Sequence, residues 1–91
     1  MLKKGDFETF MYFLECYYCQ TFVILDALKQ QADDFALHQP KQRCEQLKNE
    51  LIQLRQNSWY DIKYFMLRET GRRFKKEKDF NHLIDTILSS L

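Results

Sequence analysis

The chain has 91 residues and a formal net charge of +1, and 45% of its residues are hydrophobic, 15% aromatic and 30% charged. This length fits one domain, and the aromatic content excludes an intrinsically disordered chain. Two glycines and one proline are too few for a β-sandwich or barrel, which needs a turn about every 8–12 residues. The composition therefore predicts an all-α protein.

The N-terminal half predicts neither a signal peptide nor a membrane span. Asp6 and Glu8 interrupt the sequence before any apolar run begins. The most apolar stretch, residues 10–25, is 16 residues long and contains Glu15, whereas a bilayer span needs about 20 residues. Because the chain also has an odd number of cysteines, three, we expect a reduced, cytoplasmic protein without membrane contact.

Two long helices are expected first. One covers about residues 7–36 and follows an N-cap at Asp6. The other covers about residues 41–70, because Pro40 suits a helix start and Gly71 suits a left-handed C-cap. Helices of matched length joined by a short connection fold back on each other, so we expect a long antiparallel helical hairpin.

A basic connector over residues 71–78 leads to a shorter C-terminal helix over about 79–90, which completes a single helical domain of residues 1–91. Hydrophobic residues recur at helical spacing in the later helices. One face of the second helix contains Cys44, Leu47, Leu51, Leu54, Ser58, Ile62 and Phe65. A separate short stripe on its opposite side contains Tyr60, Tyr64 and Leu67. The third helix has an amphipathic face of Phe80, Leu83, Ile84, Ile87, Leu88 and Leu91.

The first predicted helix is apolar around most of its circumference. Besides a broad aromatic face, it carries a second stripe on the far side, made of Tyr12, Cys16, Cys19 and Val23. One partner helix and a short third helix cannot cover a helix that is apolar on most sides. We therefore predict that these four residues form a partner interface, in a homodimer whose two hairpins make a helical bundle or in a hetero-complex.

The cysteines and histidines do not favour a metal or redox site. Cys16 and Cys19 have CxxC spacing, but redox pairs lie at a helix N-terminus, and this pair is predicted in mid-helix. A zinc site needs further ligands, and Cys44, His38 and His82 are not paired at close spacing. We expect small packing residues, with zinc binding or an oxidation-sensitive interface as the alternatives, and therefore no metal and no cofactor.

The second candidate site is a basic segment, residues 68–78, that contains Arg68, Arg72, Arg73, Lys75, Lys76 and Lys78. Its local net charge is +4, since Glu69 and Glu77 oppose these six residues. Such a cluster can contact phosphates, and Phe74 in its middle can stack on a base. The alternatives are an acidic protein partner and a solvated run of charge that ends the helix.

Catalysis finds little support in the sequence. The chain has no glycine-rich phosphate loop, and its three serines, Ser58, Ser89 and Ser90, have no histidine at a suggestive spacing. We expect no catalytic residue and no small-molecule substrate. The expected function is that of a non-enzymatic protein–protein interaction module, a small regulatory, inhibitor or adaptor protein that acts through the stripe on its first helix. The alternative is a nucleic-acid-associated protein that binds phosphates through the basic segment.

Overall fold

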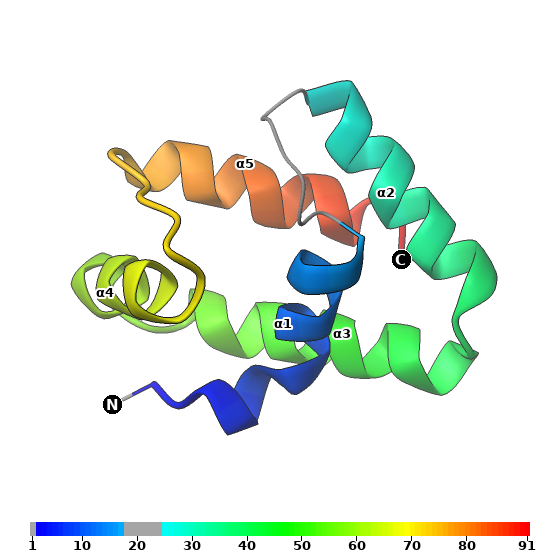
Figure 1. Ribbon diagram of the computed structural model, residues 1–91, viewed down its shortest axis with the longest axis horizontal. Helices are drawn as coiled ribbons and strands as arrows, with labels where there is room; N and C mark the ends of the chain where they lie inside the picture. Colours follow the sequence, from blue (N-terminus) through cyan, green and yellow to red (C-terminus); the bar gives the residue numbers. More distant parts are fainter. Residues whose placement is uncertain (1, 18–24) are drawn as a thin grey trace.

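The computed structural model describes residues 2–17 and 25–91, and all regular structure within them is helical. The prediction of an all-α protein is confirmed for these residues. In chain order the elements are η1 (Lys4–Phe7), α1 (Glu8–Cys16), α2 (Leu25–His38), α3 (Lys41–Arg55), α4 (Trp59–Thr70) and α5 (Glu77–Leu88) (Figure 1).

The prediction of one helix over residues 7–36 is wrong, because α1 ends at Cys16. Tyr17 lies at the C-cap, and its backbone N–H donates to the carbonyl of Phe13 at 2.9 Å. In one straight helix Phe13 and Phe35 would lie about 33 Å apart, whereas their ring centroids are 5.7 Å apart. Two shorter helices therefore allow these phenylalanines to share one core.

The helix predicted over residues 41–70 is also divided, into α3 and α4. The side-chain amide of Asn57 donates to two carbonyl groups in the last turn of α3, at 3.1 and 3.3 Å. The Ser58 hydroxyl then accepts the backbone N–H of Asp61 at 3.2 Å and caps the first turn of α4. Side chains at this point thus satisfy backbone groups at two helix ends, and the helix axis changes direction.

The other helix ends lie close to their expected positions. Pro40 is the N-cap of α3. Gly71 is the C-cap of α4, with a φ of 73° that glycine adopts without strain, and its N–H donates to the carbonyl of Leu67. Helix α5 begins at Glu77 rather than at residue 79, so the connector is shorter than predicted.

The described helices pack around one core instead of forming a hairpin of two long rods. Helix α1 and η1 pack on α3, α2 packs on α5, and α3 also contacts α2 and α5. In Figure 1, α1 lies in the middle of the molecule, with α2 and α4 at opposite ends.

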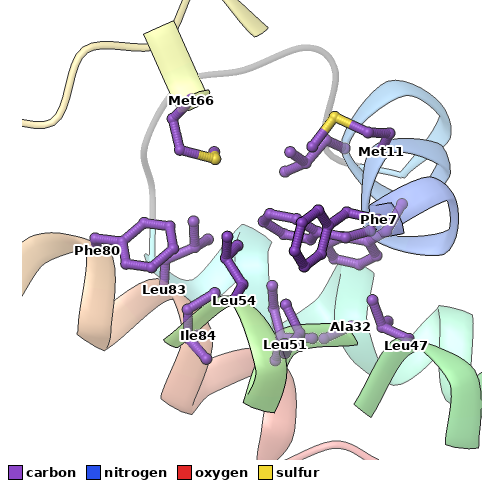
Figure 2. Close-up of a cluster of buried hydrophobic side chains, with 14 of the residues drawn as sticks. Phe7, Met11, Ala32, Leu47, Leu51, Leu54, Met66, Phe80, Leu83 and Ile84 are labelled. Atoms are coloured by element: carbon purple, nitrogen blue, oxygen red, sulfur yellow. The ribbon is translucent and has the colours of Figure 1, made fainter. Parts of the chain in front are cut away.

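Phenylalanine side chains form much of the core (Figure 2). The rings of Phe7 and Phe65 lie edge to face with centroids 5.4 Å apart, which joins η1 to α4. Full burial of one phenylalanine stabilises the folded state by about 1.5–3 kcal/mol, so the aromatic core is a main source of stability. The buried residues on the predicted faces of the second and third helices are Leu47, Leu51, Leu54, Ile62, Phe65, Phe80, Leu83, Ile84 and Ile87.

One carboxylate is buried with these apolar side chains. Glu50 of α3 is 7% exposed, and its Oε1 accepts the backbone N–H of Phe10 at 2.9 Å. No local side chain caps the start of α1, and the first N–H groups of a helix have no partner within it. Glu50 therefore acts as a cap from another helix, and its negative charge lies at the positive end of the α1 dipole.

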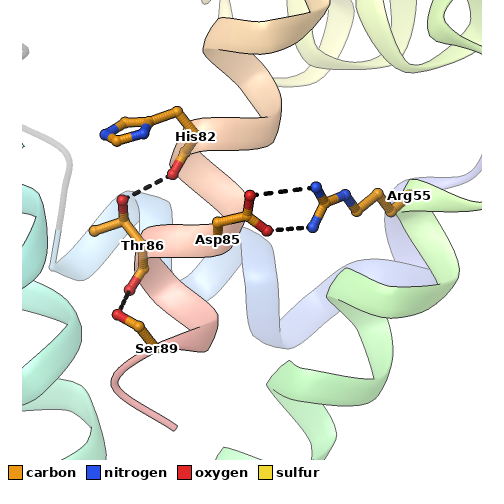
Figure 3. A network of polar contacts seen from close by, with 5 residues as sticks. All are labelled: Arg55, His82, Asp85, Thr86 and Ser89. Atoms are coloured by element: carbon orange, nitrogen blue, oxygen red, sulfur yellow. Dashed lines mark hydrogen bonds and ion pairs between the residues drawn. The ribbon is translucent and has the colours of Figure 1, made fainter.

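Helices α3 and α5 are also joined at the surface (Figure 3). The guanidinium of Arg55 donates to both carboxylate oxygens of Asp85. Further along α5, the Thr86 hydroxyl donates to the carbonyl of His82 at 2.8 Å, and the Ser89 hydroxyl donates to the carbonyl of Thr86 at 2.7 Å. The Arg55–Asp85 pair therefore joins α5 to α3, whereas the two hydroxyl bonds are local to α5 and its C-cap.

Candidate functional site

The predicted interface stripe is described only in part. Tyr12 and Cys16 both lie on α1 and are exposed. The guanidinium of Arg43 lies over the Tyr12 ring, 4.8 Å from its centroid, and the ring of Tyr17 is 6.1 Å away. Cys19 and Val23 lie outside the described residues. The structure therefore places the first half of the stripe on the surface, in a cluster with one cation.

The described cysteines form no disulfide bond with each other. Cys16 is exposed and Cys44 is half-buried, and both are free thiols. The Cys44 Sγ approaches the carbonyl oxygen atoms of Ala36 and Gln39 at 3.9 Å. Among the described residues, no group of three or more histidine, cysteine, aspartate or glutamate side chains is arranged to hold a metal ion.

The basic segment divides into residues with different surroundings. Arg68 Nε pairs with Glu69 at 3.1 Å, and its Nη2 donates to the carbonyl of Leu2 at 2.9 Å, so this arginine holds the N-terminal segment against α4. Arg72 is half-buried. Four cations further along are exposed, and within the described residues they form no ion pair: Arg73, Lys75, Lys76 and Lys78.

Phe74, in the middle of the basic segment, does not extend into solvent. It is partly buried against the core, and its ring lies edge to face with Phe80 at 5.5 Å. The Trp59 ring also contacts Phe80, with centroids 5.8 Å apart. The Phe74 ring therefore joins the connector to α5, and its stacking on a base stays a prediction.

A third surface lies on α4 and was predicted only as a short stripe without a role. Its residues Tyr60, Tyr64 and Leu67 have exposed fractions of 66%, 52% and 38%; we call them the tyrosine face. The two tyrosine rings are in edge contact, with centroids 4.8 Å apart. The signal in the sequence was that one predicted helix has two apolar stripes on opposite sides. The core can bury only one of these two stripes.

An open groove of about 490 Å³ runs beside the tyrosine face. Side chains of α4 form most of it, and Leu2 closes one side. The lining residues are Leu2, Tyr60, Asp61, Tyr64, Phe65 and Arg68. The groove therefore combines apolar walls with one cation and one carboxylate.

Charged groups border the tyrosine face on both sides. At 100° per residue, Lys63 lies at one edge of the face, and Arg68 and Asp61 lie at the other. Hydrogen bonding with the side chain of Tyr64 raises the pKa of Tyr60 above its ordinary value, and the nearby charge of Asp61 acts in the same direction. The raised pKa keeps the Tyr60 hydroxyl protonated.

In comparisons with known proteins, no family model, curated protein or solved structure matches the chain. None of the described helices has the length and hydrophobicity needed to traverse a bilayer. The assignment of function therefore depends on the surfaces described above.

Proposed function

We propose that this protein is a non-enzymatic protein-binding module, a small regulatory, inhibitor or adaptor protein. The observation that carries this proposal is the tyrosine face, because Tyr60, Tyr64 and Leu67 leave a continuous apolar row open to solvent. Tyrosine is enriched at the energetically dominant positions of interfaces, where its ring is covered and its hydroxyl can keep a polar partner. An aromatic row of this kind favours binding over a purely structural role for α4.

The α1 stripe is the second part of the proposed binding surface. Tyr12 and Cys16 are exposed on α1. The other two residues of the predicted interface, Cys19 and Val23, lie outside the described residues and stay part of the proposal. A second copy of the chain or a different protein could cover this stripe. We further propose a cytoplasmic location, in which Cys16 and Cys44 stay reduced.

Binding of nucleic acid is the second candidate function, and one observation favours it. Arg73, Lys75, Lys76 and Lys78 are exposed cations without an ion pair to the described residues. Each phosphate that such a segment neutralises would make the affinity fall with salt. This candidate predicts binding that depends on the cations of the basic segment and not on the tyrosine face.

Site-specific photo-crosslinking in the native host tests the proposed function. A benzophenone amino acid replaces Tyr64, Tyr12 or, as a control, Lys48, which is exposed on α3. We expect a discrete protein adduct from Tyr64, from Tyr12 or from both, and none from Lys48. An adduct of twice the chain mass from Tyr12 would identify the homodimer. The proposal is refuted if all three positions give the same adducts or none.

A further inference from the structure

We infer that the partner of α4 is an acidic protein segment with an apolar helical face, which lies along the tyrosine face and directs its carboxylates at the basic segment. This inference rests on the proposed protein-binding function and names the chemistry of the partner. Its grounds are the spacing of the exposed residues on α4 and the distribution of charge around them.

The exposed apolar residues of α4 have the geometry of a helix-docking surface. Tyr60, Tyr64 and Leu67 follow the i, i+4, i+7 spacing that places side chains on one helical face. Helix α4 has 12 residues, and the row from Tyr60 to Leu67 extends for about 10 Å along it. Leu2 adds an apolar side chain to the lining of the groove. A partner helix that presents leucine or aromatic residues at the same spacing can pack along this row.

The charge around this face has one dominant sign. Residues 60–78 contain seven basic and three acidic side chains, whereas the rest of the chain contains seven basic and ten acidic side chains. The α4 region therefore carries a net charge of +4 on a molecule whose remainder carries −3. Lys63 lies at one edge of the tyrosine face, and along the sequence the exposed cations begin six residues after Leu67, at Arg73. Complementary charge directs an acidic partner to this surface and fixes its register.

The same charge disfavours a second copy of this chain at α4. In a two-fold interface the same patch of both subunits meets itself. Two surfaces of net charge +4 would then face each other, and like charges brought together at an interface lower the affinity. An acidic partner removes this repulsion.

Nucleic acid fits the tyrosine face less well than an acidic helix does. Single-strand binding uses aromatic rings that accept stacked bases along a basic groove. Here Phe74 is packed on Phe80, which occupies part of its ring. Leu67 has no ring on which a base can stack. These features favour an apolar helical face over stacked bases.

Fluorescence anisotropy with defined probes tests the inference. The probes are three labelled amphipathic peptides of about 18 residues, long enough to span α4. Their apolar face is leucine, phenylalanine or tryptophan, and glutamate fills the other positions. Matched peptides carry lysine in place of glutamate, and a labelled oligothymidine represents nucleic acid. The protein is used as the full chain, and circular dichroism confirms that each variant is folded.

We expect at least one acidic peptide to bind, and its lysine counterpart not to bind. The Tyr60→Ala, Tyr64→Ala double variant should lose about tenfold or more in affinity. The Leu37→Ala, Ile52→Ala double variant, which removes two exposed apolar side chains from α2 and α3, should not. Replacement of Lys75 and Lys76 by glutamate should lower the affinity for the acidic peptide roughly fivefold to tenfold, because it changes the charge of the docking surface by four units. The same reversal at two exposed lysines of α3, Lys41 and Lys48, should have little effect.

Three results would overturn the inference: no acidic peptide binds, the lysine peptides bind equally well, or the tyrosine substitutions leave affinity unchanged. Binding of oligothymidine that is lost in the lysine reversals would assign the basic segment to nucleic acid instead. If no acidic peptide binds but Tyr64 gives a position-specific adduct in cells, only the acidic chemistry of the partner is refuted. Absence of position-specific adducts at both Tyr64 and Tyr12 refutes the protein-binding function itself.

Discussion

Replacement of Glu50 by alanine should be one of the most destabilising single changes at a polar residue of this protein. The carboxylate is 7% exposed, and its Oε1 accepts the Phe10 N–H at 2.9 Å. Loss of a hydrogen bond to a charged group costs about 1.5–3 kcal/mol, and the interaction with a helix dipole adds up to about 1 kcal/mol. We therefore expect Glu50→Ala to lower the free energy of unfolding by about 2–4 kcal/mol. Glu50→Gln keeps an acceptor oxygen and should lose only about 1 kcal/mol.

Urea unfolding followed by the fluorescence of Trp59 measures both effects. With a slope of roughly 1–2 kcal/mol/M for a domain of this size, the midpoint should fall by about 1–4 M for Glu50→Ala. Glu45→Ala is the matched control, because Glu45 is an exposed glutamate on the same helix. The reasoning is refuted if Glu50→Ala and Glu45→Ala lie within about 0.5 kcal/mol of each other, a difference typical of surface substitutions.

Three further predictions concern helix ends and surface pairs. Gly71→Ala should cost about 1–2 kcal/mol, because alanine is strained at a φ of 73°; an unchanged melting temperature would contradict this. A double-mutant cycle of Arg55→Ala and Asp85→Ala should give a coupling energy of only about 0.5–1 kcal/mol, since both side chains are partly exposed. A coupling energy that does not fall in high salt would contradict this expectation. The hydrogen bond with Ser90 lowers the pKa of Asp33 below its ordinary value of 3.8, with Lys29 acting in the same direction. This carboxylate therefore stabilises the folded state above about pH 3.8, and the contribution is lost as pH falls through the lowered pKa. The melting temperatures of wild type and Asp33→Asn should thus differ at neutral pH and converge in acid; a constant difference would show that ionisation of Asp33 is not involved.

Helical periodicity predicted which faces of the later helices are buried, because that pattern depends only on local spacing. Leu47, Leu51 and Leu54 lie in the core, as do Ile84 and Ile87 of the last helix. The helix boundaries were harder to predict. Asn57 and Ser58 interrupt the second predicted helix, although Ile62 and Phe65 continue its apolar spacing beyond the break. The break depends on hydrogen bonds that a spacing pattern does not contain.

Non-local contacts explain the other differences from the sequence-based expectations. Glu50 is buried because it meets the start of α1, 40 residues away, and a polar residue beside an apolar stripe gives no sign of this contact. Phe74 joins the core because the connector returns to α5. The tyrosine face of α4 appeared as a stripe in the sequence, but an apolar stripe does not reveal whether another helix covers it. The exposed fractions of Tyr60 and Tyr64 show that none of the described helices covers this stripe.

The location of the binding surface is the central claim, and mapping amide chemical shifts of the isotope-labelled protein tests it most directly. During titration with the tightest-binding acidic peptide, we predict that the largest shift changes occur in α4 and the basic segment, between residues 59 and 78. Changes confined to α1, α2 or the outer face of α3, with α4 unaffected, would contradict the account.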